Sequence, residues 1–365
     1  MAISFEKPYA LRQFTHVLRG FDGQLTLAVA FLAAAGLITM FASGYANGMR
    51  FWDHARNLTL AFGIMFVVAQ IPPQRLMTLA VPLYTVGLAL LVAVALFGLT
   101  KNGAKRWLNV GIVIQPSEIM KIGMPLMLAW WFQKREGQLR PLDFLVATLL
   151  LAMPVGLIAK QPDLGTAILV LAAGLYVLYF AGLGWKWIVP PLVLGLVGAV
   201  LLVVFEPTLC ADGMKWPLMR EYQRQRVCTL LDPWRDPLGK GFMQGTQTHL
   251  DFIPERTTDF IFAAYGEEFG LLGNLLLMGG FVFLVLRGLA ISLEGPTLFA
   301  RLLAGSVTLI FFTYAFVNMG MVSGILPVVG VPLPFISYGG TAMVTLGFGL
   351  GILMSVAKAK QLVQS

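Results

Sequence analysis

The chain has 365 residues, of which 58% are hydrophobic and only 12% are charged. Soluble domains carry about 25% charged residues, so the composition excludes an ordinary soluble protein and predicts a membrane protein. Each crossing of a bilayer needs about 20 apolar residues, and the chain is long enough for about ten crossings. The net charge of +8 could suggest nucleic-acid binding. Cytoplasmic loops of membrane proteins are enriched in Lys and Arg, however, so we attribute the positive charge to topology.

Apolar runs separated by charged or Pro/Gly clusters predict about ten transmembrane helices. The first run has no small-residue cleavage site after it, so we expect it to be retained as a helix and not removed as a signal peptide. The predicted helices span residues 25–43, 56–71, 76–98, 117–133, 142–159, 163–181, 186–205, 259–286, 298–323 and 340–357. We therefore expect an all-α membrane protein that forms a single polytopic domain over residues 1–365.

Lys and Arg predict the orientation of these helices. If both termini are cytoplasmic, the inner segments hold 12 Lys and Arg residues and the short outer segments hold 6. The positive-inside rule therefore favours cytoplasmic termini. The same topology makes residues 206–258 one large extracytoplasmic loop between the seventh and eighth helices.

This loop contains both cysteines of the chain, Cys210 and Cys228. Two cysteines in one extracytoplasmic loop predict a disulfide, and the alternative is a pair of free thiols. The three histidines are scattered, and neither a C-x-x-C motif nor a Gly-rich nucleotide loop occurs. No cofactor is therefore predicted, although assistance by a divalent cation, Mg²⁺ or Mn²⁺, stays open.

Ionisable residues at helix ends or within spans of a membrane protein are candidates for function. The first group surrounds the start of the fourth predicted helix and consists of Lys101, Lys105, Arg106, Trp107, Gln115, Glu118 and Lys121. Glu118 and Lys121 are three residues apart on one helix face, which predicts an ion pair. The alternative for this group is a capped helix with a Trp at the membrane interface.

Two further groups begin the sixth and eighth predicted helices. Lys160 and Asp163 form the second group, and Glu255, Arg256 and Asp259 form the third. Helix capping alone would explain both aspartates, with Thr257 or Thr258 as a further capping residue for the eighth helix.

Glu268 follows inside the eighth predicted span. At 100° per residue it faces away from Asp259 on the same helix, so we expect another helix to supply its partner, with Lys121 as the candidate cation.

Residues 324–341, before the last predicted helix, contain several Pro and Gly residues and predict irregular backbone at the membrane. Such backbone is tolerated only where protein or a cavity satisfies its polar groups. Either a rigid re-entrant connection or a part of the site would explain it.

Four motifs together resemble the SEDS family (shape, elongation, division and sporulation) over essentially the whole chain. They are K-R-W-L-N at 105–109 with Q-P-S-E at 115–118, Q-P-D-L-G-T at 161–166, F-I-P-E-R-T-T-D-F-I-F-A at 252–263 and P-L-P-F-I-S-Y-G-G at 332–340. The last motif resembles the RodA-type elongation branch more than the division branch. Family members usually carry His immediately before the Thr-Asp pair, where this chain has Thr257.

The resemblance implies a peptidoglycan glycosyltransferase that polymerises lipid II on the outer face of the bacterial inner membrane during cell elongation. It also implies a class B penicillin-binding protein as the transpeptidase partner, together with other proteins of the elongation complex. The essential aspartate of the family corresponds to Asp259, which would act as the general base. By the same motif matching, the residues that line or support the site would be Trp107, Gln115, Glu118, Lys121, Asp163, Glu255 and Arg256.

The leaving pyrophosphate of lipid II needs fixed positive charge, for which the candidates are Lys101, Lys105, Arg106, Lys160 and Arg256. The main alternative function is a flippase for lipid-linked precursors. A flippase needs polar groups at the midplane and on both sides, whereas these charges gather at the predicted outer rim. A third alternative is an inactive scaffold that recruits a partner enzyme.

Overall fold

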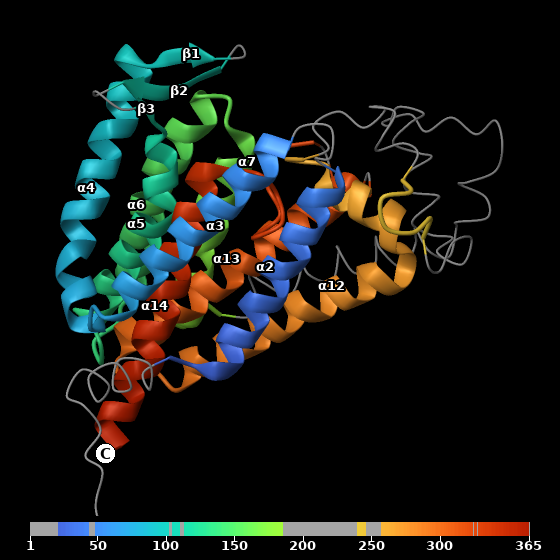
Figure 1. Ribbon diagram of the computed structural model, residues 1–365. Coiled ribbons are helices and arrows are strands. Elements are labelled where there is room, and N and C mark those ends of the chain that lie inside the picture. Colours follow the sequence, from blue (N-terminus) through green and yellow to red (C-terminus); the bar gives the residue numbers. More distant parts are fainter. Residues whose placement is uncertain are drawn as a thin grey trace, which may run out of the picture.

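The computed structural model describes residues 21–43, 48–101, 104–109, 113–184, 239–245, 257–323, 325–326 and 328–364. It is a bundle of helices with three short strands at one end, which we call the sheet end (Figure 1). The helices are α2 (Gly23–Ser43), α3 (Gly48–Ala69), α4 (Pro73–Phe97), α5 (Pro116–Gln133), α6 (Pro141–Lys160), α7 (Leu164–Phe180), α12 (Ile261–Leu293), α13 (Leu298–Val322) and α14 (Gly340–Gln364). The strands are β1 (Leu99–Lys101), β2 (Ala104–Asn109) and β3 (Val113–Ile114).

Within these described ranges, 6 helices are long and apolar enough to cross a membrane. They are α2, α4, α6, α12, α13 and the Gly340–Ala359 part of α14. Helices α3, α5 and α7 match three more of the predicted spans, whereas the predicted helix 186–205 lies outside the described residues. The chain is thus a multi-pass membrane protein, and the number of ten spans stays a prediction.

The strands were not expected, because the sequence predicts only a polar loop between the third and fourth helices. They form an antiparallel sheet in the order β1-β2-β3, with Leu99 opposite Trp107 and Leu108 opposite Ile114. The sheet lies beyond the ends of α4 and α5, on the side of the bundle opposite the C-terminus (Figure 1). The expectation of an all-α protein is therefore incomplete.

Helix α13 occupies the centre of the bundle. It contacts α12, α7, α5 and α14, and residues along its whole length are buried, Tyr314 completely. Beside it, α14 packs against α3 through Gly347 and Gly351, where an added Cβ would collide with Ala61 and Val68. Small residues four positions apart let the backbones of two membrane helices approach closely.

The irregular backbone predicted before the last helix is present in the described residues 328–339, and half of these residues, including all of 333–337, are buried. The carbonyl of Phe335 lies 3.1 Å from His54 Nε2 and packs against Gly36 of α2, where a Cβ would have no room. The protein itself thus surrounds this segment, as irregular backbone at membrane depth requires.

Helix α12 is broken at Gly270, whose φ of 62° and ψ of −157° are not helical. Residues 239–245 lie against the break. The backbone N–H groups of Lys240 and Gly241 donate to the carbonyls of Glu267 and Glu268 at 2.9 and 3.1 Å. These bonds supply partners for carbonyls near the interruption of the helix.

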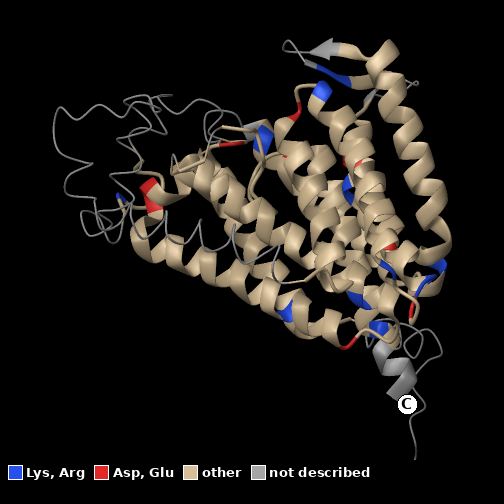
Figure 2. Ribbon diagram, turned by 180° about the vertical axis from the view of Figure 1, so that it is seen from behind, with Lys and Arg blue, Asp and Glu red and all other residues tan. Residues whose placement is uncertain are grey.

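Among the described residues, charged residues gather at the two ends of the bundle, with few along its length (Figure 2). Lys121 of α5 is an exception, since it is buried among helices. Arg106 of β2 and its ion-pair partner Asp163, at the start of α7, lie at the sheet end.

Candidate functional site

Asp259 lies in a turn, residues 257–260, that leads into α12. Neither Thr257 nor Thr258 caps this helix, contrary to prediction, because the capping position is Phe260 and no side chain caps there. Thr257 instead accepts a hydrogen bond of 2.7 Å from the Arg50 guanidinium of α3. The turn is therefore tied to the first turn of α3.

The half-buried carboxylate of Asp259 lies against Gly330 in the irregular segment. Its Oδ2 atom is 3.4 Å from the position that a Cβ on Gly330 would occupy. Gly330 has a φ of +71°, a conformation that favours glycine over other residues.

Three further groups hold the backbone of the Asp259 turn. The amide of Asn318, on α13, donates to the Asp259 carbonyl at 3.0 Å and to the Val331 carbonyl at 2.7 Å. Ser337 Oγ donates to the Thr258 carbonyl at 2.7 Å. The N–H of Tyr338 donates to the Thr257 carbonyl at 2.8 Å. The turn is thus fixed, while the aspartate side chain stays partly exposed.

Asp163 is the N-cap of α7, as helix capping predicts, and it also has long-range partners. Its carboxylate accepts from the Thr166 N–H at 3.3 Å and from Gln115 Nε2 at 2.9 Å. Arg106 of β2 forms an ion pair with it at 3.8 Å and donates to the Pro162 carbonyl. Residues predicted from two separate motifs therefore meet here.

The Asp163 and Asp259 regions share one neighbour, residues 329–331. On the α7 side, a Cβ added to Gly165 would lie 2.5 Å from the Val329 carbonyl oxygen. On the α12 side, Asp259 contacts Gly330. The irregular segment thus contacts both the first turn of α7, which Asp163 caps, and the carboxylate of Asp259.

Glu118 and Lys121 form the predicted ion pair. Lys121 Nζ donates to Glu118 Oε1 at 2.6 Å and to the Tyr314 hydroxyl at 2.8 Å, and Glu118 Oε2 accepts from Thr345 at 3.0 Å. Lys121 is only 2% exposed, so the Glu118–Lys121 pair joins α5 to α13 and α14 inside the bundle.

The prediction that Lys121 is the partner of Glu268 is wrong, since Lys121 is already bound by groups on α5 and α13. The carboxylate of the buried Glu268 interacts instead with the backbone N–H of Met243, in the segment 239–245 that lies against α12.

The other predicted residues have varied surroundings. Lys105 donates to the carbonyls of Ala95 and Leu96 at 3.2 and 3.1 Å, and so it caps the last turn of α4. Trp107 is half-buried in β2, and Lys160 is exposed at the end of α6. Lys101 is described only through its backbone in β1, and Glu255, Arg256, Cys210 and Cys228 lie outside the described residues.

Two residues of the site were missed. Arg50 is exposed in the first turn of α3, just before the run that predicted the second helix. Asn318 is a lone amide within the apolar sequence of α13. A polar side chain in an otherwise apolar span is a signal for hydrogen bonding between helices, and that signal could have identified Asn318.

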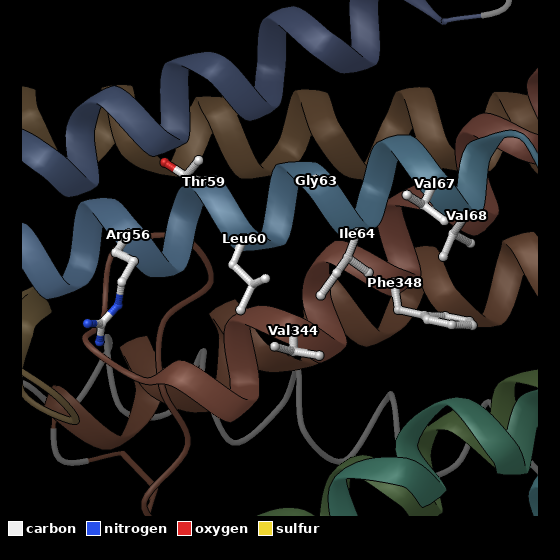
Figure 3. Close-up of a pocket in the computed structure, with 9 residues that line it drawn as sticks. All are labelled: Arg56, Thr59, Leu60, Gly63, Ile64, Val67, Val68, Val344 and Phe348. Atoms are coloured by element: carbon white, nitrogen blue, oxygen red, sulfur yellow. The ribbon is translucent and has the colours of Figure 1, made fainter.

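An apolar groove of about 900 Å³ runs between α3 and α14 (Figure 3). Its lining residues are Arg56, Thr59, Leu60, Gly63, Ile64, Val67, Val68, Val344 and Phe348. Leu60 and Val67 are 52% and 61% exposed, so the groove opens sideways from the bundle. Arg56 forms the polar end of the groove and pairs with Asp53 at 3.0 Å. Both residues lie in the first half of α3, and the first turn of this helix contacts the Asp259 turn.

In the part of the chain that the structure describes, no three His, Cys, Asp or Glu residues gather as a metal site would require. The site therefore consists of two carboxylates, nearby guanidinium groups and an apolar groove.

Comparisons with known proteins identify the family. The model of the FtsW/RodA/SpoVE family, described as cell cycle protein, matches residues 23–362. The peptidoglycan glycosyltransferase MrdB of Escherichia coli K12 is 45% identical in an alignment of 352 positions, which covers 91% of this chain and 92% of that protein.

Solved structures agree. Thermus thermophilus Rod shape determining protein RodA matches with a TM-score of 0.70 and 28% identity, over 93% of this chain and 97% of that chain. A chain of a peptidoglycan synthase complex that coordinates polymerization and crosslinking matches with a TM-score of 0.70 and 34% identity, over 93% and 98% of the two chains. As its motifs predict, this chain is a member of the FtsW/RodA/SpoVE family, which is the SEDS family.

Proposed function

We propose that this protein is a peptidoglycan glycosyltransferase that polymerises lipid II during cell elongation. Its similarity to MrdB over most of both chains supports this activity. The observation that carries the proposal for the site is the Asp259 carboxylate. It is partly exposed on a turn whose backbone is hydrogen-bonded to α13 and to the irregular segment.

Asp259 is the general base in this mechanism. It accepts the proton of the GlcNAc 4-hydroxyl of one substrate while that oxygen forms a bond to C1 of the MurNAc of another. The bond from C1 to the pyrophosphate oxygen breaks, and undecaprenyl pyrophosphate leaves. The transition state resembles the oxocarbenium ion of glycoside hydrolysis, and a positioned base accelerates such a step by about 10²–10⁴-fold.

Positive charge for the leaving pyrophosphate comes from guanidinium groups at the sheet end. Arg50 is exposed and already contacts the Asp259 turn through Thr257. Arg106 is 35% exposed in its side chain and lies beside Asp163. Lys105 is less suited, because its ammonium group caps α4.

The groove between α3 and α14 receives the polyprenyl tail of the substrate. It is lined mainly by apolar side chains and is open toward the surroundings of the bundle. The groove runs along α3 from Val68 to Arg56, and Arg50, which contacts the Asp259 turn through Thr257, lies beyond its Arg56 end. A tail in the groove with its head group at the Arg56 end would therefore direct that head group toward Asp259.

The sheet end then faces the periplasm, the termini are cytoplasmic and the protein resides in the inner membrane. A class B penicillin-binding protein is the proposed partner, and other elongation proteins join it. A solved relative belongs to a synthase complex that coordinates polymerization and crosslinking, which supports such a partner.

The test compares wild type with Asp259→Asn in a lipid II polymerisation assay, each with its transpeptidase partner, and glycan chains are resolved on a gel. Asparagine preserves the size of the side chain but cannot accept the proton, so we expect a loss of rate of at least about 10²-fold. Glu136→Gln, which removes an exposed carboxylate at the opposite end of the bundle, should retain the wild-type rate. Similar rates for wild type and Asp259→Asn would contradict the role of Asp259. A wild type that makes no glycan would contradict the activity and favour a flippase.

A further inference from the structure

Asn318 is fully buried on α13, and one nitrogen of its side chain donates to two backbone carbonyls. Its amide oxygen has no hydrogen-bond partner among the described residues. A buried acceptor without a partner is costly. Stabilisation of α13 alone would therefore not explain this side chain. Its specific contacts are made by the amide nitrogen, which donates to the two carbonyls.

The two acceptors belong to the two sides of the Asp259 site. One is the carbonyl of Asp259 itself. The other is the carbonyl of Val331, which follows the Gly330 that contacts the Asp259 carboxylate. A single nitrogen atom thus sets the spacing between the backbone of the proposed base and the surface against which its side chain rests.

Other bonds in this region hold neighbouring residues of the turn. Ser337 donates to Thr258, and Tyr338 donates to Thr257. The bond from Asn318 reaches the carbonyl of Asp259 itself, one and two residues beyond the carbonyls that Ser337 and Tyr338 bind. Loss of this bond would remove the link through Asn318 between the backbone of Asp259 and that of Val331, while the bonds to Thr257 and Thr258 stay in place.

We propose that Asn318 is a positioning residue for Asp259, which holds the carboxylate at Gly330 in the geometry needed to accept the proton from the acceptor hydroxyl. The inference rests on the proposed role of Asp259 as the base. Asn318 is buried beneath the turn and does not touch substrate, so its loss should lower kcat and leave KM for lipid II unchanged. A misplacement of about 1 Å can reduce a rate by about 10²-fold.

The experiment compares Asn318→Ala with Ser306→Ala, a matched control on the same helix. Ser306 is also fully buried and donates to a backbone carbonyl, that of Ala173, at 2.8 Å. It lies 12 residues before Asn318, about 18 Å along α13. Melting temperature, kcat and KM are measured for both purified variants with the transpeptidase partner.

We expect both variants to lose a similar amount of thermal stability. Asn318→Ala should lower kcat by about 10–100-fold with KM within about twofold of wild type, whereas Ser306→Ala should retain kcat. A kcat for Asn318→Ala equal to that of Ser306→Ala would overturn the proposal, and so would a raised KM with unchanged kcat.

A second variant protects the test against a folding defect. Asn318→Asp keeps the shape of the side chain but offers at most one hydrogen to the two carbonyls. It should show the same fall in kcat at unchanged KM. If neither variant folds while Ser306→Ala does, Asn318 serves folding and the positioning role is rejected.

Asp259→Asn is included in the same assay to separate the two hypotheses. If it retains the wild-type rate, the role of Asp259 fails and the positioning role falls with it. If Asp259→Asn is inactive and Asn318→Ala is fully active, only the positioning role fails.

Discussion

Lys121 is an ammonium group in the interior of the bundle, bound to Glu118 and Tyr314. Removal of one partner of a buried ion pair leaves the other charge unpaired and typically costs about 3–5 kcal/mol. We therefore expect Lys121→Met to lower the melting temperature of the purified protein and its level in the membrane. The double variant with Glu118→Gln should be less destabilised than the sum of the single variants.

A thermal unfolding series of the two single variants and the double variant measures this coupling. Strictly additive losses would show that the pair contributes no interaction energy. Normal stability of Lys121→Met together with lost polymerisation would instead identify Lys121 as a substrate ligand.

Asp22 precedes α2 and accepts hydrogen bonds from Arg287 of α12 at 3.0, 3.1 and 2.5 Å. Burial alone would raise the pKa of Asp22. The bonds from Arg287 and from the Leu25 N–H outweigh burial, so the pKa lies below the usual value of 3.8. A carboxyl group with a lowered pKa adds stability above its usual pKa and loses that contribution as pH falls through the lowered value.

We therefore expect the melting temperature of the wild type to fall more steeply below a pH of about 4 than that of Asp22→Asn. At pH 7 the variant should melt at a lower temperature than the wild type. Thermal unfolding in detergent between about pH 3 and pH 7 gives both curves, and parallel curves would contradict the prediction.

At the scale of residues, local spacing could predict only part of the site. The Glu118–Lys121 pair follows from a separation of three positions on one helix. Asn318 has acceptors 59 and 13 positions away, and no local pattern indicates them. The sequence offers Lys121 both Glu118 and Glu268 as partners, and the choice between these two carboxylates depends on how the helices pack.

At the scale of elements, apolar runs predict each helix of the described residues but not every helix end. Helix α3 starts at Gly48, whereas the apolar run predicts a start at residue 56. The prediction starts too late because the first turns of the helix carry the charged residues Arg50, Asp53 and Arg56. Charges at the end of a membrane helix do not interrupt the backbone hydrogen bonds, so a hydropathy pattern ends before the helix does. The strands could not be predicted, since the longest has 6 residues and no extended alternation.

The close approach of α7 to the irregular segment leads to a prediction at the same scale. A Cβ at Gly165 would lie 2.5 Å from a backbone carbonyl, that of Val329, so either α7 or the segment must move. We expect Gly165→Ala to shift residues 329–331 away from α7 and to lower the polymerisation rate by about tenfold, as a small misplacement of catalytic groups does.

Gly156→Ala is the matched control for this change. Gly156 is on α6, and an added Cβ would meet nothing within 4 Å. Alanine is preferred to glycine in a helix, so this variant should retain wild-type activity and stability. Equal activity of the two variants would show that the contact between Gly165 and Val329 does not matter for the site.

At the scale of the whole molecule, most of the described charged residues lie at the two ends of the bundle (Figure 2). The excess of Lys and Arg on the segments that share the side of the termini favours cytoplasmic termini. A reporter fused after Ser365 should therefore be active only if it works in the cytoplasm. A C-terminal fusion that is active in the periplasm would reverse the orientation and move the Asp259 site to the cytoplasmic face.

The sideways opening of the groove between α3 and α14 also determines which concentration governs substrate binding. A tail that enters from the bilayer reaches the groove by diffusion in two dimensions, so the relevant quantity is the number of lipid II molecules per unit area of membrane. The rate should therefore follow the mole fraction of lipid II among all lipids at a fixed bulk concentration. Addition of inert lipid would slow the enzyme by surface dilution, as would competition from other long polyprenyl chains for the same lateral entrance.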